Sequence, residues 1–260
     1  MTSHKNQVGA PSHEGAPALH LASVSFGKDS LATILLALRH KEPLDEAVYC
    51  EVMFDENISG EVPEHRDFIY ETALPRLAQW GIKTTILRSE MTYVSSFKRV
   101  LQRGRRAGKI SSFPLSGRCC IQRDCKLAPI RAFRKALPSN AVQYIGIAHD
   151  ERKRLFRLST AQVSLLEKYE VTENMAFELC RKEGLLSPIY EFTKRSGCFF
   201  CPNAKKPELR HLFDHHQDLW ARMLELQALP NKVSEYFNRD MSFAELDALF
   251  RFDDAQVSMF

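Results

Sequence analysis

The stretch that decides the fold is Leu19-His20-Leu21-Ala22-Ser23-Val24-Ser25-Phe26-Gly27-Lys28-Asp29-Ser30. An apolar run breaks into a short glycine-containing loop, and apolar residues then recur at helical spacing at Leu31, Ile34, Leu35 and Leu38. This pattern predicts a strand, an anion-binding loop and a docked helix. Gly27 lets the backbone approach a ligand, the first amides of the helix point at it, and Lys28 adds a formal charge. We therefore expect a phosphate group in this loop.

Two other interpretations of the loop have to be weighed. A Walker A loop needs two glycines at fixed spacing and a Ser or Thr directly after the lysine, but Asp29 follows Lys28 here. A Gly-Lys-Asp-Ser turn can also serve only to cap a helix, through Asp29 or Ser30. This capping interpretation stays open on the sequence alone.

The composition is that of an ordinary globular chain. With 260 residues, 44% hydrophobic and 26% charged, the chain is long enough for one α/β domain with an appended piece. Residues 1–17 have no apolar signal-peptide core and predict a disordered leader, and no apolar run is long enough to cross a membrane. We expect a cytoplasmic protein without a membrane partner.

The order of elements predicts the architecture. Strands are expected at 46–55, 82–87 and 142–147, and helices at 67–80, 129–137 and 174–183. A β-α-β-α-β order demands a parallel sheet, so the fold class is α/β with a doubly wound, mostly parallel sheet. Residues 185–190 are expected to be extended because of Pro188.

The remaining residues predict a helical C-terminal extension. A helix is expected over 209–228, and Ser242 with Glu245 predicts a capping box for a last helix. The predicted domains are a nucleotide-binding domain with a metal site over 18–206 and the helical extension over 207–260.

Charged residues follow two of the predicted strands, where ligands collect in such sheets. Asp55 and Glu56 follow the second strand, and Asp150 and Glu151 follow the strand that ends near Gly146. These carboxylates are candidates for ribose or Mg²⁺. The candidates for phosphate contacts are Arg123, Lys126, Arg154 and Arg157. A salt-bridged surface loop is the alternative for the charges after Gly146.

Seven cysteines without a signal peptide indicate metal binding rather than disulfides. Cys198-x-x-Cys201 presents two thiolates to one metal centre, and both tetrahedral zinc and cubane iron–sulfur sites need four. The other ligands must come from the group Cys119, Cys120 and Cys125. Cys50 and Cys180 lie in apolar segments and are expected to be buried small hydrophobic residues.

A run of basic residues and a group of three histidines are weaker indications of function. A net charge of +4 excludes a bulk nucleic-acid binder, yet a basic run lies on both sides of Gly104 and is either a solvated surface or a polyanion contact. Its members are Lys98, Arg99, Arg103, Arg105, Arg106 and Lys109. A metal ion could be bound by His211, His215 and His216, but their spacing is better explained by a hydrophilic helix face.

Taken in order, the motifs resemble the iron–sulfur branch of the phosphoadenosine phosphosulfate (PAPS) reductase family, in the PP-loop ATP pyrophosphatase or adenine nucleotide alpha-hydrolase superfamily. The resemblance covers about residues 18–206. It rests on the S-x-G-K-D-S loop and on four later segments. These are Cys119-Cys120 with Lys126 and Pro129; Gly146-Ile147 with Asp150, Glu151 and Arg154; Ser187-Pro188-Ile189; and Gly197-Cys198 with Cys201-Pro202.

The resemblance implies a [4Fe–4S] cluster beside a site for ATP or another adenine nucleotide, with Mg²⁺. Lys28 and Asp29 would be the catalytic residues. The nucleotide would be bound by Ser25, Phe26, Gly27, Lys28, Asp29, Ser30, Asp55, Gly146, Asp150, Glu151 and Arg154. The family also includes enzymes that thiolate nucleic acid, so nucleic acid and a sulfur donor or thiol partner are further candidate partners.

The sequence departs from the family at three places. The usual glycine pair of the loop is reduced to Phe26-Gly27. Lys126 lies further from Cys120 than is usual and Cys125 intervenes, which favours Cys120 and Cys125 as ligands with Cys119 as their substitute. The reductases use a cysteine in a C-terminal tail as nucleophile, and no cysteine follows Cys201.

These observations rank three functions. The leading hypothesis is an ATP pyrophosphatase that adenylates a substrate for sulfur insertion. The second is a sulfonucleotide reductase that borrows a thiol from a partner, because reduction needs a thiolate nucleophile. The third is a non-catalytic nucleotide- or nucleic-acid-binding accessory subunit of a defence or mobile-element system.

Overall fold

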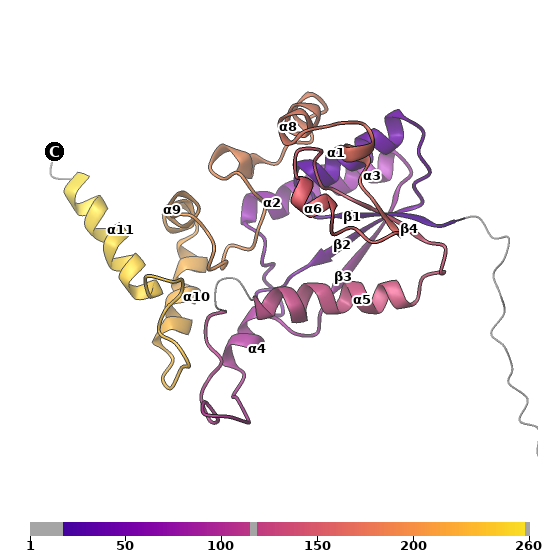
Figure 1. The fold of residues 1–260 in the computed structure, drawn as a ribbon. Coiled ribbons are helices and arrows are strands. Elements are labelled where there is room, and N and C mark those ends of the chain that lie inside the picture. Colours follow the sequence, from indigo (N-terminus) through magenta and orange to yellow (C-terminus); the bar gives the residue numbers. More distant parts are fainter. Residues whose placement is uncertain (1–17, 115–118, 258–260) are drawn as a thin grey trace, which may run out of the picture.

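A five-stranded parallel sheet forms the centre of the computed structural model, which describes residues 18–114 and 119–257 (Figure 1). The strand order is β3-β2-β1-β4-β5, and every neighbouring pair is parallel. The strands are β1 His20–Val24, β2 Glu46–Glu51, β3 Lys83–Arg88, β4 Val142–Ile145 and β5 Gln162–Val163. The predicted doubly wound sheet is confirmed, and its strand order reverses between β1 and β4.

β2 ends earlier than its apolar sequence predicts. The chain turns back after Val52, whose carbonyl accepts a hydrogen bond from the Gly60 amide at 2.7 Å. Inside this turn the Asp55 carboxylate accepts hydrogen bonds from the amides of Asn57 and Ile58 at 3.0 and 2.8 Å. The predicted strand over 46–55 is therefore a strand followed by a tight, side-chain-closed turn.

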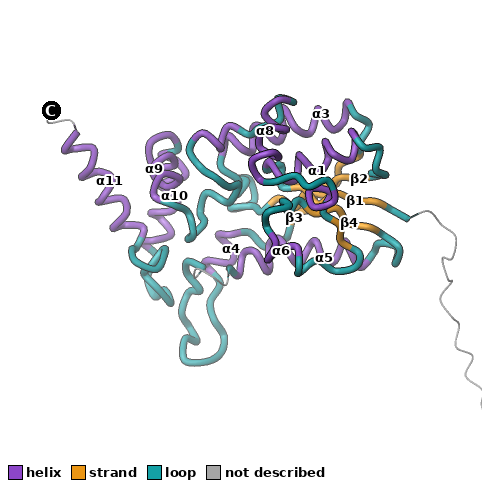
Figure 2. The backbone as a smooth tube through the Cα atoms, turned by 45° about the horizontal axis from the view of Figure 1, so that its top comes forward, coloured by secondary structure: helices purple, strands orange, loops and turns teal. Residues whose placement is uncertain are grey.

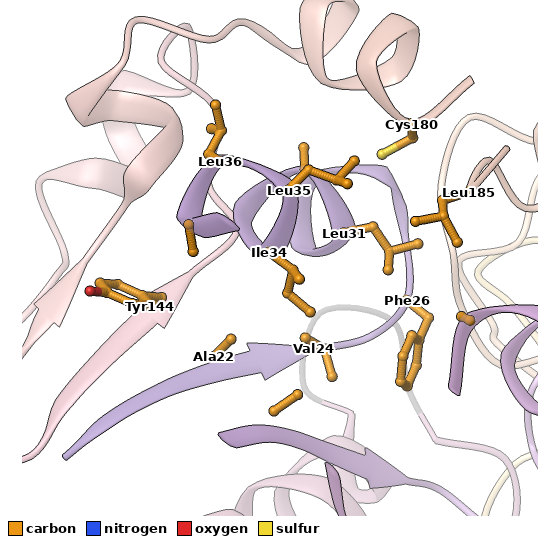
Figure 3. Packing of buried hydrophobic residues seen from close by; sticks show 14 of the residues in the cluster. Ala22, Val24, Phe26, Leu31, Ile34, Leu35, Leu36, Tyr144, Cys180 and Leu185 are labelled. Carbon is orange, nitrogen blue, oxygen red and sulfur yellow. The ribbon is translucent and has the colours of Figure 1, made fainter. Parts of the chain in front are cut away.

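One face of the sheet is covered by α1 (Lys28–Arg39), α7 (Leu165–Lys168) and α8 (Glu173–Lys182), and by a continuous helical segment formed by α2 (Pro63–Asp67), η1 (Phe68–Ala73) and α3 (Leu74–Gln79). Figure 1 shows α1, α3 and α8 on one side of the strands and α5 on the other. Leu31 and Ile34 are fully buried and pack over Val24 of β1 (Figure 3). Leu38, which the periodicity places inward, is 39% exposed instead.

The caps of α8 follow the sequence. The Thr172 side chain accepts a hydrogen bond from the Met175 amide, and Gly184 beyond the C-terminus has a φ of +66°. Pro188 begins a short 3₁₀ helix, η3 (Pro188–Glu191), so the expected extended segment over 185–190 is wrong in its second half. The first turn of a helix tolerates proline, which has no amide hydrogen to donate.

On the opposite face lie η2 (Gln122–Leu127) and α5 (Ala128–Lys135), with the short helix α4 (Tyr93–Lys98) near them (Figure 2); α6 spans Arg152–Leu155. The predicted helix over 129–137 thus begins earlier, as a π-helical turn that contains Cys125. None of the residues of α5 is buried. The apolar side of this helix therefore does not pack tightly onto the sheet.

The C-terminal region consists of α9 (Lys206–His215), α10 (Gln217–Ala228) and α11 (Phe243–Val257). The predicted single helix over 209–228 is interrupted at His216, whose φ of −133° and ψ of 60° are not helical. The predicted capping box of Ser242 and Glu245 is present. These helices surround Trp220 and share a second hydrophobic cluster with Tyr93, Phe97 and Phe199.

The expected leader, residues 1–17, lies outside the described residues. Within the described part of the chain, none of the helices has the length and apolarity that a bilayer crossing requires.

Candidate nucleotide and iron–sulfur site

The loop between β1 and α1 leaves the N-terminus of α1 without a side-chain cap. Gly27 precedes the first residue of α1 and has no side chain to cap it. The Ser30 hydroxyl donates a hydrogen bond to the Gly27 carbonyl at 2.9 Å, while the Asp29 carboxylate accepts from Lys28 Nζ at 2.8 Å. Neither side chain caps the helix, so the capping interpretation fails. Among the amides of the first turn, that of Lys28 donates to the Tyr190 hydroxyl, and those of Asp29 and Ser30 are left for a ligand.

Phe26 stands where the PP-loop pattern that the sequence resembles has a glycine, and its backbone adopts a glycine-like conformation. Its φ is +55°, in the left-handed region that non-glycine residues rarely occupy. The ring is fully buried and meets Tyr49 edge to face, with ring centroids 5.1 Å apart. Phe26 therefore anchors the loop in the core through its side chain, and only its backbone can contact a nucleotide.

Gly146 brings the end of β4 against the N-terminus of α1. A Cβ atom at this position would lie 2.7 Å from the Ser30 amide nitrogen and 2.8 Å from the Asp29 carbonyl carbon. Only glycine permits so close an approach of two backbones. β1 and β4 are the strands between which the order reverses, which is where doubly wound sheets bind their ligands.

A cavity of about 690 Å³ opens from this loop between the sheet and α5. One end is polar and formed by the loop. The other is apolar, with Val48 and Ile145 of the sheet facing Ile130 and Phe133 of α5. The partly exposed apolar face of α5 is thus a cavity wall. The volume and the division into a polar and an apolar end suit a nucleotide, with its phosphates at the loop and its base against α5.

Acidic groups surround Lys28 at the polar end. Carboxylate oxygens of Asp29, Glu151 and Glu173 lie within 4.8 Å of one another. Lys28 Nζ lies 3.7 Å from Glu173, and Arg154 pairs with Glu151 at 2.5 Å. Burial raises the pKa of Asp29, although its bonds to Lys28 oppose this. Clustered carboxylates beside a phosphate loop suit a hard cation such as Mg²⁺.

Tyr190 of η3 and the residues that follow this helix also line the cavity, and the sequence did not predict their position there. The Tyr190 hydroxyl accepts a hydrogen bond from the Lys28 amide at 2.9 Å, and burial raises the pKa of Tyr190 to about 12. Lys194, Arg195 and Ser196 also line the cavity. Only their position next to the Cys-x-x-Cys segment could have singled them out. A neutral tyrosine and two cations here add phosphate-binding capacity to the loop.

Most of the predicted nucleotide residues are gathered at the cavity. Those that line it are Ser25, Gly27, Lys28, Asp29, Ser30, Lys126, Gly146, Glu151 and Arg154.

Asp55 and Asp150 are not among the lining residues. Asp55 accepts a hydrogen bond from Arg222 of α10 at 2.9 Å, and Asp150 accepts one from the Glu173 amide at 3.1 Å. The buried Asp55 carboxylate pairs with α10 and the exposed Asp150 carboxylate binds the first amide of α8, so neither lies at the cavity lining.

Three weaker candidates also lie away from the cavity lining. Glu56 and Arg157 are exposed, and Arg123 pairs with its neighbour Asp124 at 2.6 Å. Charge near a strand end or near the cysteines was therefore too broad a criterion, because five of the eight charged candidates do not line the cavity.

Four cysteine thiols lie near enough to the buried hydroxyl of Tyr93 to act on it. Burial raises the pKa of Tyr93 well above its ordinary value, and the nearby thiols of Cys120, Cys119, Cys198 and Cys201 raise it further. The hydroxyl has no hydrogen-bond partner among the described residues. A buried, unpartnered donor that faces four thiols fits a group with exposed sulfur atoms, to which it could donate a hydrogen bond.

The spacing of the sulfur atoms is wider than a single-ion site. Among the described residues, no three cysteine sulfurs lie within 4.8 Å of one another. Four thiolates on one zinc ion lie about 3.8 Å apart, given Zn–S bonds of about 2.3 Å and tetrahedral angles. A four-iron cluster spreads its thiolates over four separate metal atoms. The residues present therefore fit the cluster better than zinc.

Cys125 is not among the thiols that act on Tyr93, although Cys119 and Cys120 lie near enough to act on it. It is fully buried, its pKa is raised to about 11 by burial, and its carbonyl lies 3.7 Å from the Cys50 sulfur. Cys119 is half-buried and near Cys120 and Cys201. We therefore prefer Cys119 to Cys125 as a ligand, whereas the sequence alone favoured Cys120 with Cys125. The extra residues before Lys126 form the π-helical turn η2, which turns Cys125 into the core.

The cysteines and the nucleotide cavity share two cations. Lys126 lines the cavity, and its charge acts on the thiol of Cys198. Arg195 lines the cavity as well, and its charged group interacts with Cys201. The four-cysteine site is therefore adjacent to the nucleotide cavity.

Cys50 and Cys180 are buried, as expected. Cys180 donates to the Lys28 carbonyl at 3.2 Å, and Cys50 lines the cavity with its pKa raised to about 11 by burial. Neither thiol is disposed to ionise.

Comparisons with known proteins add little. No protein-family model and no curated protein matches the sequence. Among solved structures, one that aligns is described as the U34-tRNA thiolase NcsA from Methanococcus maripaludis with its [4Fe-4S] cluster, at 15% identity and a TM-score of 0.38. The alignment covers 89% of this chain and 80% of that chain. The likeness is too distant to assign a family, so the function is inferred from the geometry of the site.

Proposed function

We propose that this protein is a PP-loop ATP pyrophosphatase that adenylates an acceptor for sulfur transfer, with a [4Fe–4S] cluster beside its nucleotide site. The observation that carries the proposal is the single cavity of about 690 Å³ that joins an open helix N-terminus to a wall next to four cysteines. A phosphate loop alone would support only nucleotide binding. A metal site in contact with the same cavity supports chemistry on the activated substrate.

The residues of the loop would promote cleavage between the α- and β-phosphates. An acceptor oxygen attacks the α-phosphorus, the bond from this phosphorus to the β-phosphate oxygen breaks, and pyrophosphate leaves. Lys28 and the first amides of α1 would stabilise the charge that develops on pyrophosphate. Asp29, Glu151 and Glu173 would hold Mg²⁺ against the same phosphates.

Cys119, Cys120, Cys198 and Cys201 would hold the cluster, and Tyr93 would donate a hydrogen bond toward it. When bound, such a cluster supplies an iron atom or sulfur atom that can bind the sulfur to be transferred. Lys126 and Arg195 lie between the two sites and would keep the anionic nucleotide oriented toward the cysteines.

Nucleic acid is the acceptor class that the surface supports. The basic run of residues 98–109 forms an exposed loop after α4, seen at the bottom of Figure 2, and its six cationic side chains are all exposed. None of the six forms an ion pair with another described residue, although the charge of Arg99 helps to lower the pKa of Asp124 after the larger effect of Arg123. A loop of this charge is a suitable contact for a phosphate backbone.

The sulfonucleotide reductase alternative needs a reactive thiol. The thiol nearest a bound nucleotide is Cys50, and its raised pKa keeps it protonated and a poor nucleophile. A reductase would therefore depend on a thiol from a partner, as the sequence already indicated.

Binding and product analysis test the proposal together. Calorimetry on anaerobically purified protein should show ATP binding that is weakened in Lys28→Ala and unchanged in Lys182→Ala, an exposed lysine at the end of α8. Turnover should yield AMP and pyrophosphate. Sulfite released from adenosine phosphosulfate or PAPS in the presence of thiols would support the reductase instead. If neither AMP with pyrophosphate nor sulfite is formed, the protein is the non-catalytic accessory subunit.

A further inference from the structure

Three side chains outside the nucleotide cavity converge on one point. The Nε2 atoms of His211 and His216 lie 2.6 and 3.0 Å from the same oxygen, Oε1 of Glu64. The three ligand atoms all lie within 4.8 Å of one another. We propose that Glu64, His211 and His216 form a binding site for one Zn²⁺ ion that fastens the C-terminal helices to the sheet domain.

The backbone places these residues from three elements. Glu64 lies in the first turn of α2, His211 lies on α9, and His216 occupies the non-helical break between α9 and α10. The His211 ring is stacked on Phe192, with centroids 3.6 Å apart and planes inclined by 7°. The break at His216, which the sequence pattern did not predict, is what turns the second imidazole toward Glu64.

The environment leaves one oxygen of Glu64 unused. Oε2 of Glu64 is buried and has no hydrogen-bond partner among the described residues. Its other oxygen, Oε1, already accepts hydrogen bonds from both imidazoles. A buried oxygen without a partner costs stability, and a cation bound to this carboxylate would supply the partner that the described residues do not.

The donor set selects the metal. Two imidazole nitrogens and one carboxylate oxygen form a common zinc set, and a fourth position is left for water. His211 also lines a small cavity of about 20 Å³, which has room for one water molecule. Without metal, both Nε2 atoms must carry hydrogens to bond Oε1, and zinc would replace these hydrogens.

The test must separate this site from the cysteines, because Cys198 lines the same small cavity. Full-length protein with its cluster is equilibrated with Zn²⁺, passed over a weak chelator, and analysed for zinc and iron by mass spectrometry. X-ray absorption at the zinc edge then identifies the ligands. Parallel samples carry His211→Ala, His216→Ala, Glu64→Gln or, as the matched control, His215→Ala, an exposed histidine of the same helix.

The expected result is about one zinc per chain, with nitrogen and oxygen neighbours at about 2.0 Å and no sulfur at about 2.3 Å. Each ligand variant should retain about a tenth of this zinc or less at unchanged iron content, whereas His215→Ala should retain all of it. The parent's melting temperature should also rise with Zn²⁺. A parent that retains no zinc, or zinc bound only to sulfur, or equal zinc in His211→Ala and His215→Ala, would overturn the proposal.

Discussion

Replacing Gly146 by alanine tests the contact that positions the phosphate loop. The added Cβ would lie 2.7 Å from the Ser30 nitrogen and 2.8 Å from the Asp29 carbon. Both atoms belong to the backbone of the first turn of α1, so no side chain can rotate away. Because an ordinary carbon–nitrogen contact is about 3.5 Å, the end of β4 and the loop must separate by roughly 0.7 Å.

This displacement has two measurable consequences. Overpacking of this kind costs about 1–3 kcal/mol, so the free energy of unfolding in urea should fall by that amount. The loop amides and Lys28 would also be misplaced relative to the phosphates, and ATP should bind about tenfold more weakly or worse. Calorimetry on the folded variant measures the second effect separately from the first.

Gly104→Ala is the matched control. Gly104 has a φ of +81° and no atom within 4 Å of its ideal Cβ position, so alanine there adds backbone strain without crowding. It should cost about 1 kcal/mol of stability and leave ATP binding intact. If Gly146→Ala binds ATP as tightly as the parent, the phosphate loop does not bind the nucleotide in the way we describe.

Three further changes probe the site. Lys28→Ala should weaken ATP binding by about 1.5–3 kcal/mol in a folded protein, and equal affinity in calorimetry would contradict the role of this lysine. Cys119→Ser should lose iron and acid-labile sulfide under anaerobic assay, whereas Cys125→Ser should keep both; the reverse would restore Cys125 as a ligand. Because burial raises the pKa of Asp29, the folded state holds this proton more tightly than the unfolded chain, and stability is lost as pH rises through the folded pKa. Asp29→Asn should remove this loss. Denaturant titrations from about pH 4 to pH 7 should then show a smaller decrease in the free energy of unfolding for Asp29→Asn than for the parent.

The sequence was most informative where one local pattern determines the backbone. The apolar run up to Val24, the loop at Gly27 and the periodic residues from Leu31 predicted strand, loop and helix, and these are present. Thr172 and Gly184 marked the ends of α8 in the same way. Such features depend on hydrogen bonds within a few residues, so neighbours in the sequence suffice to predict them.

Features that depend on distant partners could not be predicted in this way. Asp55 resembled a ligand at a strand end, but Arg222 of α10 binds its carboxylate. The sequence favoured Cys125 over Cys119, but the π-helical turn places Cys125 in the core. Tyr93 and Tyr190 belong to no motif. Their environments are created by segments that lie far away in the sequence.

The histidines of the C-terminal helices illustrate the same limit. Their spacing suggests one hydrophilic helix face, because spacing along the sequence assumes an unbroken helix. The non-helical backbone of His216 and the position of Glu64 at the start of α2 convert two of them into a convergent group, and His215 remains exposed.

The fate of the γ-phosphate of ATP tests the central claim most directly. Anaerobic, cluster-containing protein is incubated with ATP labelled at the γ-phosphorus, Mg²⁺ and total cellular RNA, and the labelled products are separated by chromatography. Cleavage between the α- and β-phosphates predicts that the label appears in pyrophosphate, in the parent and not in Lys28→Ala. Label released as orthophosphate would show cleavage at the γ-phosphate and would contradict the account.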